Sequence, residues 1–127
     1  MISISPATRI VISLSFMVLL VVVSIIPGRA EPGDSAFFWL VAKTPTLLQK
    51  TLHVCLYGVL TLLLKWTLDA TPAKLYSPVI AFAIAVFLGA SLEWYQTKVP
   101  GRFGTIFDIA LNAAGAALGL FAAILFL

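Results

Sequence analysis

Four long apolar stretches constrain the fold of this chain more than any other feature. A membrane helix needs about 20 mainly apolar residues, because each advances about 1.5 Å through a hydrocarbon core about 30 Å thick. The stretches that meet this requirement run from about 10 to 26, 47 to 66, 78 to 95 and 105 to 127. We therefore predict an all-α, polytopic membrane protein, in which residues 1–127 form a single domain with a bundle of four transmembrane helices.

The composition agrees with a membrane location. Of the 127 residues, 61% are hydrophobic and 10% are charged, whereas about 25% of a soluble domain is charged. So few charges cannot cover a water-facing surface, which excludes a soluble enzyme, a disordered chain and a nucleic-acid binder. The net charge of +3 fits basic loops beside anionic headgroups. We expect membrane lipids as partners, and no nucleic acid.

The first apolar stretch has two interpretations. In one it is a secretory signal peptide, with Arg9 as the basic region and Gly28-Arg29-Ala30 as a cleavage site. Its apolar core is longer than the roughly 7–15 residues typical of such signals, so we favour a retained helix that ends at Pro27-Gly28. The aromatic run 37–41 that follows is too short to span, and we predict a short interfacial segment there.

Polar side chains are costly inside a membrane, and in this sequence they occur at matching depths. Residues three or four positions apart share one face of a helix. The end of the third span and the starts of the second and fourth lie at the same side of the membrane. The sets that share a face are Lys50, His53 and Tyr57 in the second span, Glu93 and Gln96 in the third, and Asp108 and Asn112 in the fourth, with Arg102 in the basic turn between the last two spans.

Small residues favour close packing next to these polar sets. Ala81, Ala85 and Gly89 recur every four residues and lead to Glu93, and a G-x-x-x-G pattern occupies 115–119. Small faces allow membrane helices to approach closely. We therefore expect a packed seam that leads to a polar cluster in the bundle interior, and such faces are also suited to a homo- or hetero-oligomer.

Each polar residue also has a structural interpretation. Lys50 can extend to the headgroups, Glu93 can pair with Arg102 or Lys50, and the amides and Tyr57 can cross-link helices. Taken together, six or more ionisable or amide groups at one depth favour a functional site.

The order of these residues resembles the VanZ-like membrane protein family from about Pro45 to Gly119. The family usually has an acid where this chain has Gln49, which weakens any role that needs a carboxylate there. The matching motifs are Gln49-Lys50-x-x-His53-x-x-x-Tyr57, Glu93-x-x-Gln96-x-x-x-Pro100-Gly101-Arg102 and Asp108-x-x-x-Asn112-x-x-Gly115.

The resemblance implies a multi-pass protein of the bacterial cytoplasmic membrane, with the motif side outside the cytoplasm. It also implies a link to susceptibility to the glycopeptide teicoplanin, and no established metal or organic cofactor. With a cytoplasmic N-terminus, three basic residues lie inside and five outside, the reverse of the positive-inside rule. The excess of basic residues outside is explained if three of them, Lys50, Lys98 and Arg102, serve a binding site.

Three functions fit these residues. In the first, an anionic lipid-linked or cell-wall-related ligand binds at the polar cluster. In the second, His53 and Glu93 are catalytic acid/base groups of an intramembrane enzyme, although no nucleophile is evident. In the third, the chain is a structural subunit of a membrane assembly. One histidine with two carboxylates is too few donors for us to predict a metal site. The predicted ligand-binding residues are Lys50, Tyr57, Gln96, Arg102, Asp108 and Asn112.

Overall fold

The computed structural model describes residues 3–25, 46–98 and 106–127. Within these ranges every regular element is helical, and the prediction of an all-α fold is confirmed. Four helices are long and apolar enough to cross a membrane. The elements are α1 (Pro6–Ile25), α3 (Thr46–Leu68), a short 3-10 helix η1 (Lys74–Tyr76), α4 (Ser77–Gln96) and α5 (Ile106–Phe126).

The helix bounds follow the apolar stretches, with one extension that local chemistry explains. Helix α1 begins at Pro6, well before the predicted start near residue 10. The Ser5 hydroxyl accepts a hydrogen bond from the Thr8 amide at 3.1 Å, which is N-terminal capping, and proline suits the first helical position. The predicted stop at Pro27-Gly28 and the interfacial segment 37–41 lie outside the described residues.

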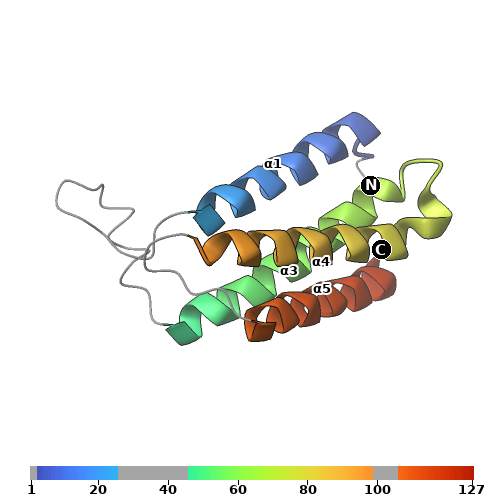
Figure 1. Cartoon of the computed structure of the whole chain (residues 1–127). Helices are drawn as coiled ribbons and strands as arrows, with labels where there is room; N and C mark the ends of the chain where they lie inside the picture. Colours follow the sequence, from blue (N-terminus) through green and yellow to red (C-terminus); the bar gives the residue numbers. More distant parts are fainter. Residues whose placement is uncertain (1–2, 26–45, 99–105) are drawn as a thin grey trace.

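The four long helices lie side by side, with α1 and α4 running in one direction and α3 and α5 in the other (Figure 1). Helix α3 contacts each of the other three. The ends of α1 and α4 and the beginnings of α3 and α5 lie at one end of the bundle (Figure 1). We call this end the motif end, because it contains the polar sets that the sequence places at matching depths.

Helices α3 and α5 pack with their backbones in close approach. A Cβ atom built on Gly119 would lie 2.6 Å from the carbonyl carbon of Gly58 and still nearer to its oxygen. A Cβ atom on Gly115 would meet the backbone of Val54 in the same way. The G-x-x-x-G pattern therefore lies in the seam between two helices, which brings the start of α5 against the start of α3.

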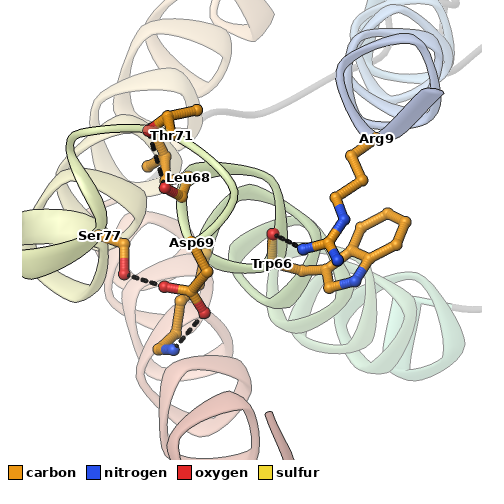
Figure 2. A network of polar contacts seen from close by, with 7 residues as sticks. Arg9, Trp66, Leu68, Asp69, Thr71 and Ser77 are labelled. Carbon is orange, nitrogen blue, oxygen red and sulfur yellow. Dashed lines mark hydrogen bonds and ion pairs between the residues drawn. The ribbon is translucent and has the colours of Figure 1, made fainter. Parts of the chain in front are cut away.

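A polar contact joins α1 to α3 at the opposite end of the bundle. The Arg9 guanidinium donates a hydrogen bond to the Trp66 carbonyl oxygen at 2.7 Å (Figure 2) and lies 4.7 Å from the centre of the Trp66 ring. The buried hydroxyls of Ser13 and Thr67 are 2.7 Å apart. Cation–π and hydrogen-bond contacts are strong in an apolar environment, so they fix how α1 lies against α3.

The turn between α3 and α4 is organised around Asp69 (Figure 2). Its carboxylate forms an ion pair with Lys65 at 2.8 Å and accepts a hydrogen bond from the Ser77 hydroxyl at 2.5 Å. Burial acts to raise the pKa of Asp69, but the hydrogen bonds from Lys65 and Ser77 and the charges of Lys65 and Lys74 outweigh it and lower the pKa below its ordinary value. Asp69 is therefore ionised at neutral pH and links the two helices.

Candidate functional site

Among the buried polar residues toward the motif end, three come from three different helices. Tyr57 on α3 is 2% exposed, Glu93 on α4 is 3% exposed and Asn112 on α5 is 2% exposed. Polar side chains removed from both water and lipid are costly unless they have partners or a task. Their burial shows that the predicted polar faces turn toward the bundle interior.

Gly89 shows how closely Tyr57 and Asn112 approach each other. A Cβ atom on Gly89 would lie 3.1 Å from Cε1 of Tyr57, 3.2 Å from Cβ of Asn112 and 3.3 Å from its Nδ2. One methyl group at this position would therefore touch both side chains. Because Gly89 is one turn before Glu93 on α4, the three buried residues face a common region of the interior.

Asn112 carries an orphaned acceptor. Its Oδ1 atom is fully buried and has no hydrogen-bond partner within the described residues. An amide oxygen can accept two hydrogen bonds, and more than nine in ten buried polar groups in proteins have a partner. An unsatisfied oxygen costs about 1–3 kcal/mol, so this atom is the strongest local indication that the motif end accepts a donor from outside the described chain.

Glu93 and His53 both lie near Tyr57. Glu93 is buried on α4 one turn after Gly89, and a Cβ atom on Gly89 would lie 3.1 Å from Cε1 of Tyr57. The His53 ring is half-buried, and its centre is 6.5 Å from the centre of the Tyr57 ring at an interplanar angle of 46°. The two residues predicted as catalytic in an enzyme thus share Tyr57 as a neighbour, one from the same helix and one from across the α3–α4 interface.

Lys50 and Asp108 lie nearer to the beginnings of α3 and α5. The Lys50 ammonium is 4.9 Å from the centre of the Phe107 ring on α5, a cation–π distance that places positive charge over the start of that helix. Asp108 is half-buried in the first turn of α5, where a negative charge interacts favourably with the helix dipole.

Gln96 connects the site to α1. Its Nε2 donates a hydrogen bond to the carbonyl oxygen of Ser24 at 3.1 Å, and both residues are buried. Gln96 therefore holds the ends of α4 and α1 together, which leaves one further N–H and the amide oxygen for other contacts. Two positions later, the exposed Lys98 ammonium lies 3.9 Å from the centre of the Trp94 ring.

The motif positions Pro100 and Gly101 lie outside the described residues. Arg102 lies outside the described residues, and of Gln49 only the helical backbone is described. Within the described ranges, no group of three His, Cys, Asp or Glu side chains is arranged to hold a metal ion.

The sequence patterns missed the part that α1 plays here. No residue of the first span is among the predicted site residues, whereas the Ser24 backbone accepts the hydrogen bond that positions Gln96. Ser13 and Ser24 are the buried polar residues of α1. Ser24 indicates which face of α1 turns inward, but its acceptor is a backbone carbonyl, which no side-chain pattern identifies.

Fold and site together define a multi-pass helical membrane protein with a buried polar cluster at one end of the bundle. The family model for VanZ/LLP1 matches residues 5–127, and the chain belongs to this VanZ-like family. No curated protein and no solved structure was found to match it.

Proposed function

We propose that the motif end binds an anionic, lipid-linked or cell-wall-related ligand of the bacterial envelope and thereby modulates envelope properties, including glycopeptide susceptibility. On this proposal the protein lies in the cytoplasmic membrane with the motif end facing outward. Family membership supports an envelope role, and the chemistry of the buried residues supports ligand binding.

The observation that carries the proposal is the unsatisfied oxygen of Asn112. A buried acceptor binds a donor, and the hydroxyl and amide groups of sugars and peptides are donors of this kind. Gly89 borders both the Tyr57 ring and the Asn112 side chain, and the buried Glu93 lies one turn further along α4. A ligand with several hydroxyl or amide groups would satisfy these atoms together, as in other sites with a few convergent polar groups.

Positive charge at the same end supports an anionic ligand. Lys50 stands at the start of α3 and Lys98 follows the end of α4, and Arg102 occupies the family motif four residues later. Lysine binds phosphate as a compact charge, whereas arginine binds it through two parallel hydrogen bonds. A phosphate or pyrophosphate linked to a lipid lies at this depth, just beneath or within the headgroup layer.

Asn112→Leu is expected to abolish the effect on teicoplanin susceptibility without loss of protein from the membrane. Leucine has a similar volume and removes an unsatisfied oxygen, so the free energy of unfolding of the unliganded protein should rise by about 1 kcal/mol. Susceptibility, membrane abundance and the unfolding midpoint in detergent are measured together. If Asn112 only joins helices, the same variant loses stability and abundance instead.

Further variants distinguish binding from catalysis. Glu93→Gln and His53→Ala should also remove the susceptibility effect at normal abundance, as should Tyr57→Phe. Tyr76→Phe is the matched control, because Tyr76 is exposed at the opposite end. Turnover of a labelled lipid-linked precursor that stops in Glu93→Gln would show the chain to be an enzyme rather than a binding protein. A normal phenotype in all three site variants would refute both functions.

Arg102→Lys is expected to weaken binding about tenfold or more, because the paired hydrogen bonds of the guanidinium are lost while the charge remains. Lys98→Arg is the reciprocal control in the same turn and should retain function. Binding of a pyrophosphate-linked polyprenyl lipid to the purified protein provides the measurement. Equal affinity of Arg102→Lys and wild type would exclude bidentate recognition by Arg102.

A further inference from the structure

An open groove lies between α1 and α4 on the outer side of the bundle. Its volume is about 750 Å³, within the range of about 300–1,000 Å³ that is usual for small-molecule sites. Val21 lines it from α1, and residues between Phe87 and Tyr95 line it from α4. Because these residues belong to the later halves of two helices that end together, the groove lies in the half of the bundle next to the motif end (Figure 1).

The lining of this groove is suited to a hydrocarbon chain. Phe87 is 75% exposed and Ala90 is half-buried, and both belong to a candidate membrane span. The exposed rings of Trp94 and Tyr95 follow about one turn after Ala90, and such rings are typical of the level where the hydrocarbon core meets the headgroups. The groove therefore runs from the headgroup level into the apolar core of the membrane.

A positive charge stands at the headgroup end of the groove. The exposed Lys98 ammonium lies 3.9 Å from the centre of the Trp94 ring, and Trp94 is part of the groove wall. Lys98 forms no ion pair within the ranges that the structure describes, so its N–H groups can bind an anion. A phosphate bound there would place the first carbons of its chain at the mouth of the groove.

The inner side of the groove is closed by contacts between α4 and α1. Gln96 donates its hydrogen bond to the Ser24 carbonyl at the end of both helices, and Leu92, the most buried residue of the lining, is 9% exposed. A chain in the groove is thus separated from the buried Glu93 and Asn112, which the headgroup of the same ligand can approach around the end of α4. The groove suits the lipid part of a ligand, and the polar cluster suits its headgroup.

We propose that the α1–α4 groove holds the hydrocarbon chain of the lipid-linked ligand, with the ligand phosphate beside Lys98. This inference rests on the proposed function, and it assigns a place to the part of the ligand that the polar cluster does not bind. On this arrangement the ligand enters sideways from the membrane, because the groove is open along the outer face of α4.

Ser91→Phe tests the proposal without threatening the fold, because Ser91 lines the groove and is exposed. The added ring would occupy the groove rather than the packed interior. Binding of a pyrophosphate-linked polyprenyl lipid to the purified full chain in detergent should weaken about tenfold, which the loss of about ten carbon–carbon contacts would produce. Ala114→Phe is the matched control, because Ala114 is exposed on α5, outside the groove, and it should bind the lipid as wild type does.

A photoreactive group in the polyprenyl chain, near the pyrophosphate, gives a second and direct measurement. Crosslinks should form with Val21 and with α4 between Phe87 and Tyr95, and an excess of phosphatidylglycerol should leave them unchanged. Crosslinks elsewhere, their loss to phosphatidylglycerol, or an unchanged affinity of Ser91→Phe would overturn the groove assignment.

The failure of this inference can be distinguished from the failure of the proposed function. Asn112→Leu should weaken binding of the polyprenyl lipid whichever surface holds the chain, so a weak Asn112→Leu beside an unchanged Ser91→Phe would refute the groove alone. If wild type does not bind the polyprenyl lipid, the proposed function is refuted and this inference with it.

Discussion

Gly119→Ala is expected to lower the free energy of unfolding by about 3 kcal/mol, although alanine is intrinsically about 1 kcal/mol better than glycine in a helix. The added Cβ would lie 2.6 Å from both Cα and the carbonyl carbon of Gly58. Backbone atoms cannot move aside by changing a rotamer, so α5 must separate from α3 along the seam. The unfolding midpoint of the purified protein in detergent measures the effect.

A graded series of alanine variants shows whether the backbone approach is responsible. Gly115→Ala should be similarly damaging, because its Cβ would lie 2.9 Å from two backbone atoms of Val54. Gly58→Ala should cost less, because its nearest neighbour would be the Gly115 oxygen at 3.1 Å. Gly119→Ala with wild-type or higher stability would mean that the two helices are not packed this closely.

The second large effect is expected from Asp69→Asn, which should cost about 3 kcal/mol of unfolding free energy. The Lys65 side chain is only 10% exposed, and the change removes its counter-charge. Breaking such a buried ion pair is strongly destabilising. Asparagine can still accept the hydrogen bond from Ser77, so the loss of unfolding free energy measures the effect of removing the Asp69 charge. The midpoint of unfolding in detergent is again the measurement.

A double variant and a pH titration serve as controls for this ion pair. Lys65→Met combined with Asp69→Asn removes both charges and should recover most of the stability. Because the pKa of folded Asp69 is lowered from its ordinary 3.8, its stabilising contribution is complete above that value and is lost as the pH falls through the folded pKa. The difference between wild type and Asp69→Asn should be constant near neutral pH and shrink below about pH 4. If Asp69→Asn alone were as stable as the double variant, the Lys65–Asp69 ion pair would not be stabilising.

Most of the helical architecture could be predicted from the sequence. Apolar stretches long enough to cross a membrane define four helices, since lipid penalises every unpaired backbone group and every charge. The beginning of α1 was the least accurate bound, because apolarity identifies the buried part of a helix, whereas Ser5 and Pro6 determine where its backbone starts.

The polar site could be predicted as a set of faces but not as a set of contacts. Helical spacing indicated that Glu93 and Asn112 face inward, and both are buried. Spacing could not show that Asn112 keeps an unsatisfied oxygen or that Gln96 donates to α1. Of the Asp69 contacts, the i,i+4 pair with Lys65 has a sequence signal, whereas the hydrogen bond from Ser77 of α4 depends on the tertiary structure.

The sequence alone determined the class of this protein, its approximate spans and the depth of its polar residues, because these follow from the cost of placing each side chain in lipid. Only the tertiary structure decided which buried atoms are satisfied, which helices touch backbone to backbone and how Asp69 contacts both Lys65 and Ser77 at the α3–α4 turn. Those features depend on the rotation and separation of neighbouring helices, and the packing of small residues such as Gly58 and Gly119 sets both.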